Sequence, residues 1–225
     1  MTTTTKYPRT LHLPFSPGLQ NDDRRVENGW EELLEHTLVL TEKMDGENSC
    51  MSKYDVFARS HGAPTRNPWS RNLWDIGGLH DQIKNKIGEN EYIYGENLYG
   101  IHSIEYTQLT NYFHLFGVRN DSIWYSWDDV ELMANCLEIP TVPVLEIHKF
   151  TSVKELEEHI LFYMSKGSRY GSEIEGVVVR NVEAYPIDEF QKNVVKYVRK
   201  GHVQTDQFWV KNWKKAKLNY FNCNK

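Results

Sequence analysis

The stretch LVLTEKMDG, residues 38–46, begins with three apolar residues and ends in charged residues and a glycine. Its apolar run predicts a strand, and Asp45-Gly46 is typical of a tight turn. Lys43 therefore stands at the exit of a strand, where burial and neighbouring cations can lower the pKa of its amine and make it a nucleophile. Average composition yields a Lys-x-Asp-Gly tetrapeptide in about one chain in twenty of this length, so an ordinary strand-end turn is the alternative explanation.

Five further segments after Lys43 combine an apolar or aromatic run with charged residues. Each has an ordinary explanation when taken alone. Glu175-Gly176 before three valines fits a turn into a core strand, and Lys196 fits an edge-strand residue that opposes aggregation. Their joint occurrence in one order is hard to assign to chance. The segments are FARSHG (57–62), YGEN (94–97), YFHLFGVR (112–119), EGVVVR (175–180) and VVKYVRK (194–200).

The periodicity of apolar residues predicts an α+β fold in one domain. Ser152 with Glu155 forms a capping box that opens one helix, and Asn28 with Glu31 can cap another. Helices interrupt the strands without alternating strictly with them, which favours mostly antiparallel sheets, and no stretch resembles a linker. We expect helices at 28–36, 73–87, 126–137 and 152–164, and strands at 38–40, 50–58, 91–94, 112–118, 123–125, 174–179 and 194–198.

The composition excludes several classes of protein. Hydrophobic residues make up 40% of the 225 residues and aromatic residues 13%, which suffices for a core and excludes a disordered chain. The three cysteines Cys50, Cys136 and Cys223 are odd in number and form no CxxC pair, so neither a disulfide framework nor a zinc site is expected. No apolar run approaches the roughly 20 residues of a membrane span. We expect a soluble, intracellular protein of the cytoplasm that has no membrane partner.

The six segments together resemble the nucleotidyl motifs of the covalent nucleotidyltransferases, which comprise polynucleotide ligases and mRNA capping enzymes. The chain is most similar to the RNA ligase 2-like branch of the ATP-dependent RNA ligases, over residues 42 to about 200. The resemblance implies an ATP-grasp-like ligase adenylation domain with mostly antiparallel sheets flanked by helices. After Lys200 only 25 residues follow, too few for an OB-fold. We expect a single adenylation domain over 1–225, with a loosely structured polar lead-in at 1–25 and a basic aromatic tail at 201–225.

The resemblance also implies a reaction in three steps. Lys43 would attack the α-phosphate of ATP, which gives lysyl-AMP and releases pyrophosphate. AMP would then pass to an RNA 5′-phosphate, and an RNA 3′-OH would finally displace AMP to form the phosphodiester bond. Phosphoryl transfer needs positioning and cationic stabilisation more than covalent help, which agrees with the residue types present. The expected cosubstrate is ATP, the cofactor Mg²⁺ or Mn²⁺, and the partner RNA with 5′-phosphate and 3′-OH ends, bound by a monomer.

The resemblance implies a separate role for each of several charged residues. Carboxylates would bind ribose hydroxyls or hold a hydrated divalent cation, whereas Lys196 would contact the α-phosphate and depress the pKa of Lys43. Arg180 has no role to carry over, and a salt bridge is expected for it. The catalytic residues would be Lys43, Lys196 and Asp45, of which Asp45 positions the reacting groups. Lys43 and Lys196 would also bind the nucleotide. The other nucleotide-binding residues would be Glu42 (adenine), Arg59 (phosphates and RNA end), Glu96 (ribose), Phe116 (adenine stacking, with Phe113 as alternative), Glu175 (metal and phosphate) and Lys200.

The last segment departs from the pattern of the family, which usually carries two lysines separated by one residue. Here Lys196 is followed two residues later by Val198. A strand alternates faces, so Lys200 shares the side of Lys196 whereas Arg199 points away. Lys200 is therefore the candidate for the second cation.

The tail mixes aromatic residues with lysines, and the charge of the chain is uneven. Residues 190–225 hold nine Lys/Arg against Asp206, although the whole chain has a net charge of −5, which is unlike a typical nucleic-acid binder. A basic aromatic helix can grip an RNA backbone, but the same helix can simply pack on the core with solvated lysines. The expected RNA-binding residues are Arg59, Lys211, Lys214 and Lys215, with weak and salt-sensitive affinity.

Two other functions stay open. GTP:RNA guanylyl transfer uses the same covalent chemistry, although the expected lack of an OB-fold counts against it. A nucleotide-binding or RNA-end-binding module without catalysis is the second, because the Lys196 segment is altered, although the set Lys43, Glu96 and Glu175 counts against it.

Overall fold

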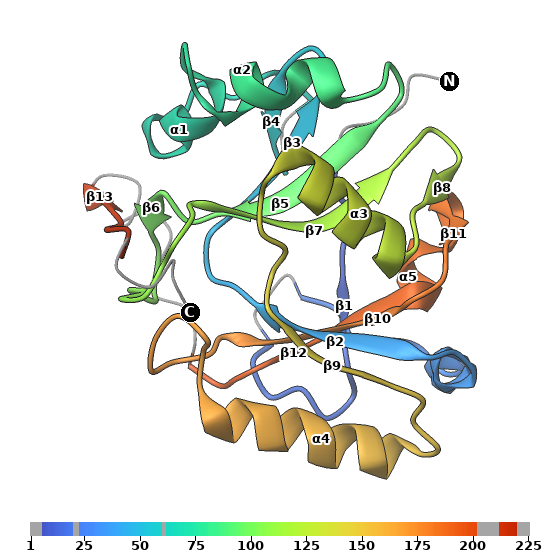
Figure 1. Ribbon diagram of the computed structural model, residues 1–225. Coiled ribbons are helices and arrows are strands. Elements are labelled where there is room, and N and C mark those ends of the chain that lie inside the picture. The colour runs from blue at the N-terminus through green and yellow to red at the C-terminus, as the bar shows by residue number, and fades with distance from the viewer. Residues whose placement is uncertain (1–5, 20–22, 60–61, 202–211, 220–225) are drawn as a thin grey trace.

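The computed structural model describes residues 6–19, 23–59, 62–201 and 212–219. Two sheets face each other (Figure 1), and nearly all their strand pairs are antiparallel. The first sheet runs β1 (Leu11–His12), β12 (Val194–Val198), β10 (Gly176–Asn181), β2 (Leu38–Lys43), β9 (Val144–His148). The second runs β11 (Tyr185–Pro186), β8 (Ile123–Trp124), β7 (Phe113–Arg119), β5 (Tyr92–Asn97), β3 (Glu47–Ser52), β4 (Val56–Ala58). The predicted α+β fold with mostly antiparallel sheets is confirmed.

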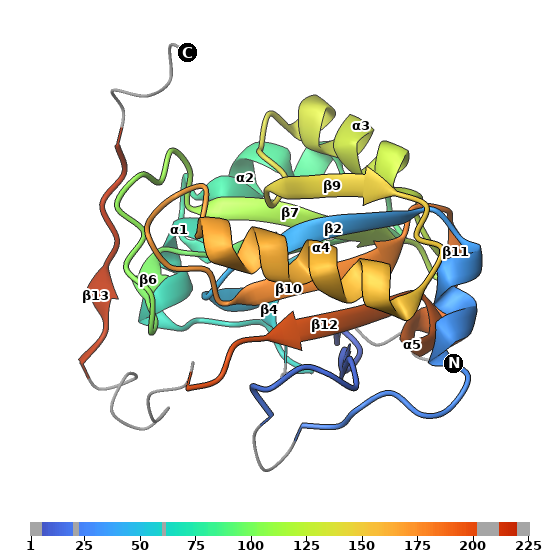
Figure 2. The same ribbon diagram turned by 90° about the horizontal axis from the view of Figure 1, so that it is seen from below.

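Helices cover the outer faces of both sheets. α4 (Val153–Lys166) lies across the first sheet (Figure 2), and α3 (Trp127–Leu137) packs on β7 of the second. Ser126 and Ser152 cap these two helices, each accepting a hydrogen bond from the backbone three residues later, which confirms the cap predicted for Ser152. No described helix is long and apolar enough to span a membrane. The shorter helices are α1 (Arg71–Trp74), α2 (Leu79–Ile83), α5 (Phe190–Asn193) and the 3-10 turns at Trp30–Glu35, Pro68–Ser70, Lys84–Lys86 and Ile187–Glu189.

Strand β10 shows how the alternation of side chains places the core and a cavity on opposite faces. Val177 and Val179 are fully buried in a cluster with Leu156 and Ile160 of α4. Burial of such an aliphatic side chain contributes about 1.5–3 kcal/mol. Val178 points the other way and lines a cavity between the two sheets. The valines of β10 therefore serve both faces of the sheet: two of them pack in the core, and the third lines the cavity.

The predicted helix 73–87 is wrong, because a double glycine interrupts it. Gly77 has φ of 75°, a left-handed conformation that favours glycine, and the chain leaves the helix at Asp75. Ile76, which fits the apolar periodicity, is 96% exposed. The segment forms the end of α1, the short helix α2 and one 3-10 turn at Lys84–Lys86.

Other boundaries differ in ways that follow from local chemistry. The predicted helix 28–36 is a 3-10 helix capped by Gly29 at φ 91°, with no side-chain cap from Asn28. The predicted strand 50–58 is two strands, β3 and β4, and β5 continues through Glu96 instead of ending before it. The strand 194–198 is confirmed at both ends.

The two ends of the described chain pack onto the sheets. In the segment at 6–25, β1 pairs in parallel with β12 and Leu13 is fully buried, so the described part of this segment is not the loose lead-in that we expected. In the tail, β13 (Lys214–Lys215) pairs with β6 (Gly100–Ile101), so these two lysines lie in a strand and not in the expected helix. Backbone hydrogen bonding to a sheet edge overrides the helical spacing here.

Gly176 provides a test of the packing between β10 and β12. A Cβ at this position would lie 2.1 Å from the carbonyl oxygen of Tyr197, and this backbone contact cannot relax as a side chain would. We expect Gly176→Ala to lower the free energy of unfolding by at least about 2 kcal/mol, measured by urea denaturation. Gly62→Ala is the matched control, because its Cβ would meet no described atom within 4 Å; equal stability of the two variants would contradict this account.

Candidate active site

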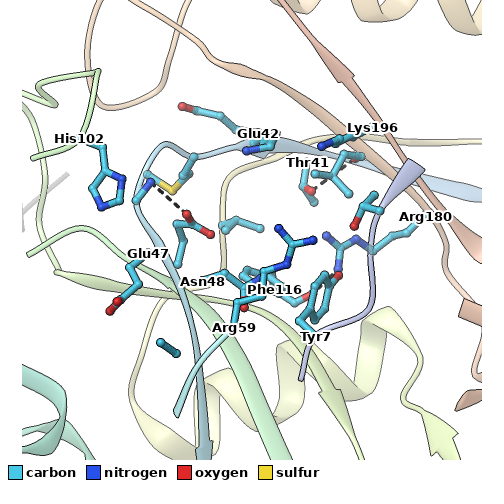
Figure 3. Close-up of a pocket in the computed structure, with 18 of the residues that line it drawn as sticks. Tyr7, Thr41, Glu42, Glu47, Asn48, Arg59, His102, Phe116, Arg180 and Lys196 are labelled. Atoms are coloured by element: carbon cyan, nitrogen blue, oxygen red, sulfur yellow. Dashed lines mark hydrogen bonds between the residues drawn. The ribbon is translucent and has the colours of Figure 1, made fainter. Parts of the chain in front are cut away.

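A cavity of about 560 Å³ lies between the two sheets. Figure 3 shows side chains from both sheets pointing into it. Most of the predicted catalytic and nucleotide-binding residues line this cavity, whereas Asp45, Glu175 and Lys200 do not. The predicted residues that line it are Glu42, Lys43, Arg59, Glu96, Phe116 and Lys196.

Lys43 is paired with Glu175 at the end of β2. The antiparallel register places Gly176 opposite Lys43, and the Nζ of Lys43 lies 2.5 Å from Oε1 of Glu175. Burial favours the neutral amine, but the carboxylates of Glu175, Glu96 and Asp45 outweigh it and raise the pKa of Lys43. This direction is opposite to the depression that we expected from Lys196, because the carboxylates dominate the surroundings of the amine in the ligand-free molecule.

Glu96 lines the cavity, and the pKa of its carboxyl group is raised. Its Oε1 accepts a hydrogen bond of 3.0 Å from the backbone N–H of Gly46. Burial, together with the charges of Glu175 and Asp45, raises its pKa to about 8 in spite of the opposing charge of Lys43. The crowding of carboxyl groups around one lysine therefore disfavours the ionised form of Glu96, which keeps its proton at neutral pH.

Asp45 connects the turn after Lys43 to the loop that contains Ser103 and Ile104. Its Oδ2 accepts hydrogen bonds from the backbone N–H groups of Ser103 (2.7 Å) and Ile104 (2.6 Å). The backbone N–H of Asp45 donates to the hydroxyl of Tyr106 at 2.8 Å. These contacts fit a positioning role, since they hold the loop that brings His102 to the cavity.

Two apolar side chains from opposite sheets line the cavity. Phe116 comes from β7 and Val178 from β10. The ring of Tyr7 stands edge-on to Phe116, with centroids 5.1 Å apart. Phe113, the alternative stacking candidate, is buried away from the cavity, where Gly95 packs on its ring. The two apolar walls make a slot into which a flat base can stack.

Glu42 supplies an acceptor at this slot. Its Oε2 accepts from the backbone N–H of Arg169 at 3.1 Å, while its buried Oε1 has no hydrogen-bond partner within the described ranges. Burial raises the pKa of this carboxyl group despite hydrogen bonds from Ser168 and Arg169. A buried acceptor without a partner is costly unless a ligand donates to it.

Three further cations surround the slot. Arg59, Arg180 and Lys196 line the cavity, and Figure 3 shows the guanidinium groups of Arg59 and Arg180 turned toward its interior. Lys196 forms an ion pair of 3.0 Å with Asp23. Arg180 donates to the carbonyl oxygen of Phe116, and no carboxylate of the described residues forms the salt bridge that we expected for it.

The predicted cations after β12 lie elsewhere. Lys200 is exposed beyond the end of β12, and Arg199 pairs with Glu173. Lys214 and Lys215 are exposed on β13, where the Nζ of Lys215 lies 5.0 Å from the ring centroid of Tyr99. Lys211 lies outside the described residues.

Sequence reasoning missed several residues that line the cavity. Arg180 follows Val178 by two positions, so strand alternation already places it on the same face. Asn48 lies five residues after Lys43, and its buried Oδ1 has no partner among the described residues. Tyr7 and Thr10 come from the first segment of the chain, and no local pattern predicts that they line the cavity or that Tyr7 contacts Phe116.

A divalent cation fits this site only together with a ligand. Among the described residues, no group of three or more His, Cys, Asp or Glu side chains can hold a metal ion. Mg²⁺, however, commonly binds through one or two carboxylates plus substrate phosphates. Glu175 and Glu96 both lie within the electrostatic reach of Lys43, and a bound cation would favour the ionised form of both carboxyl groups.

Comparisons with known proteins agree with this architecture. The chain superimposes on an archaeal ATP-dependent RNA ligase with a TM-score of 0.56 and 15% identity, over 86% of this chain and 48% of that one. It also superimposes on a variant of a Naegleria gruberi RNA ligase that was solved with ATP and Mn. The TM-score is 0.54 and the identity 14%, over 93% of this chain and 62% of that one. The chain thus spans about half the length of the archaeal ligase. The comparison with curated proteins found no match.

The chain has the fold of the ligases with which it superimposes. The family model for RNA ligase matches residues 36–198, more than half of the chain. The chain belongs to the RNA ligase family.

Glu96 generates a test of the site's electrostatics. Between about pH 4.5 and about pH 8 the folded protein holds a proton on Glu96 that the unfolded chain has lost, so stability falls as the pH rises through this window. Glu96→Gln keeps an acceptor for Gly46 but cannot titrate. We expect the variant to lose less stability across the window, measured by urea denaturation at both ends of it.

The exposed Glu158, which pairs with Lys154 on the surface of α4, provides the control variant Glu158→Gln. Parallel stability profiles of wild type and Glu96→Gln would show that Glu96 titrates normally.

Proposed function

We propose that the chain is an ATP-dependent RNA ligase that joins 3′-OH and 5′-phosphate RNA ends through a lysyl-AMP intermediate. One observation carries the proposal: Lys43 lies at a cavity that has an apolar slot for a base and several cations for phosphates. The membership of the chain in the RNA ligase family supports ligation as the class of reaction. The archaeal relative is described as ATP-dependent, and the Naegleria variant was solved with ATP and Mn.

In the first step, ATP would stack its adenine between Phe116 and Val178. The unpartnered Oε1 of Glu42 would accept from the amino group of the base, and Glu96 would bind the ribose. Arg59 and Lys196 would contact the phosphates and stabilise the charge that develops in phosphoryl transfer. The neutral amine of Lys43 attacks the α-phosphorus; a P–N bond forms as the bond to pyrophosphate breaks, and pyrophosphate leaves.

The attack requires a neutral amine, yet the ligand-free site holds Lys43 protonated against Glu175. A Mg²⁺ or Mn²⁺ ion bound with ATP would neutralise carboxylate and phosphate charge. Glu175 would hold such an ion, and the ion's positive charge would weaken the attraction of this carboxylate for the proton of Lys43.

The second and third steps would use the same residues. A 5′-phosphate oxygen of the RNA attacks the lysyl-AMP phosphorus, the P–N bond breaks, and Lys43 is restored. A 3′-OH then attacks the 5′-phosphate, AMP leaves, and the phosphodiester bond is complete. Arg59 would hold the RNA 5′ end, and Lys200, Lys211, Lys214 and Lys215 would contact the RNA backbone.

Labelling of the protein tests the covalent step. Incubation with α-labelled ATP and Mg²⁺ or Mn²⁺ is expected to leave label on the denatured wild-type band, and Lys43→Ala is expected to carry none, because it lacks the nucleophile. Lys53→Ala is the matched control, since Lys53 is a surface lysine paired with Glu89. Label from GTP alone would favour guanylyl transfer, and no label from either nucleotide would leave a binding module.

The tail lysines give an independent test of RNA binding. Replacement of Lys214 and Lys215 together by Ala is expected to weaken binding of a 5′-phosphate single-stranded RNA and to lower its salt dependence. The log–log slope should fall by about 0.7 for each RNA phosphate that a lysine no longer neutralises. Lys154→Ala, on the outer surface of α4, is the control. Unchanged affinity and slope, measured by fluorescence anisotropy over a salt series, would remove these lysines from the RNA interface.

A further inference from the structure

The segment at residues 11–18 covers the free edge of β12, the strand that carries Lys196. His12 stands opposite Lys196 in the parallel register of β1 and β12, and the N–H of Leu13 donates to the carbonyl of Lys196 at 2.9 Å. The N–H of Gly18 donates to the carbonyl of Val198 at 2.9 Å. These contacts hold the segment against the last nucleotidyl segment, although it precedes the stretch that the family model matches.

The same segment fixes Asp23 beside Lys196. The N–H of His12 donates to the carbonyl of Arg24 at 2.8 Å, and the N–H of Val26 donates to the carbonyl of His12 at 2.9 Å. Oδ2 of Asp23 lies 3.1 Å from Nε2 of His12, and Oδ1 lies 3.0 Å from Nζ of Lys196. One carboxylate thus spans a buried imidazole and the cavity lysine.

His12 and Ser16 link Asp23 to the end of β12. Burial and the nearby charge of Lys196 lower the pKa of His12. Nδ1 of the ring lies 2.8 Å from Oγ of Ser16, while Nε2 lies beside Oδ2 of Asp23 in a close contact and has no hydrogen-bond partner among the described residues. The Ser16 hydroxyl is also within 3.5 Å of the carbonyl oxygen of Val198. The Ser16 oxygen in turn accepts from the N–H of Val198 at 3.0 Å.

Asp23 holds Lys196 from outside the cavity. Lys196 lines the cavity, whereas Asp23 does not, and the two side chains are only 16% and 18% exposed. A lysine ammonium has three N–H donors. One donates to Asp23, which leaves two for a phosphate. The carboxylate therefore orients the ammonium without occupying the place of a ligand.

We infer that Asp23 is a positioning residue for Lys196, held in place by His12 and Ser16, and that it sets the ammonium against the α-phosphate of ATP. The inference rests on the proposed function, because Lys196 has a phosphate to contact only if the chain forms lysyl-AMP. It also accounts for a single lysine in β12. The other lysine of the family's pattern is replaced by Val198, and a fixed ammonium makes less demand on a second cation.

The test measures the rate of lysyl-AMP formation at saturating α-labelled ATP, together with the KM for ATP. We expect Asp23→Ala to lower the rate by about tenfold or more, because small displacements of a positioned group cost that much. Asp23→Asn keeps an acceptor at the same place and is expected to retain part of the rate. In a Lys196→Ala background, Asp23→Ala is expected to cause no further loss, because the two act through one ammonium.

Matched measurements separate positioning from folding. Glu158→Gln removes the carboxylate of a surface ion pair on α4 and is expected to react as wild type. Melting temperatures of all variants identify any loss of rate that comes from unfolding. If Asp23→Ala does not fold, the isosteric variant Asp23→Asn replaces it in the comparison.

Three outcomes would overturn the inference. An Asp23→Ala rate equal to or above that of labelled wild type would show that Asp23 does not help Lys196, and would leave the proposed function intact. An equal loss in the wild-type and Lys196→Ala backgrounds would show that Asp23 acts elsewhere. An unlabelled wild type would overturn the proposed function, and this inference with it.

Discussion

The antiparallel pairing of β2 with β10 is the constraint on which the site depends. It sets Gly176 opposite Lys43 and thereby brings the preceding residue, Glu175, within 2.5 Å of the lysine amine. Glycine at 176 permits this, because a side chain there would collide with the carbonyl oxygen of Tyr197 on β12. Three strands are thus locked together at the point where the chemistry-bearing residues meet.

The same pairing decides the resting charge state of the site. Carboxyl groups are gathered around Lys43, and Arg59, Arg180 and Lys196 also line the cavity. The carboxylates favour the protonated amine, and the cations have N–H groups that can donate to an anion. The proposed complex of ATP with a divalent cation would match both kinds of charge, although the whole chain has a net charge of −5.

Local patterns predicted much of the fold. Strand β12, the two serine-capped helices and the α+β class follow from periodicity and capping chemistry, which depend on neighbouring residues. The helix at 73–87 failed because Ile76 fits the spacing, while Gly77 allows a left-handed turn that spacing does not register. Strands β1 and β13 were missed because each is only two residues long and exists through its partner at a sheet edge.

Most of the candidate site was predictable in kind, but not in its electrostatics. The sequence by itself, through the resemblance of its six segments to the nucleotidyl motifs, pointed to the residues proposed for the chemistry, Lys43, Glu96, Phe116, Glu175 and Lys196 among them, because the order of short segments can be read along the chain without a structure. Only the tertiary structure decided which charges are neighbours: Glu175 is 132 positions from Lys43, and Asp23 is 173 positions from Lys196. The direction of a pKa shift depends on distances through space and on burial, and neither is encoded in the spacing of residues along the chain.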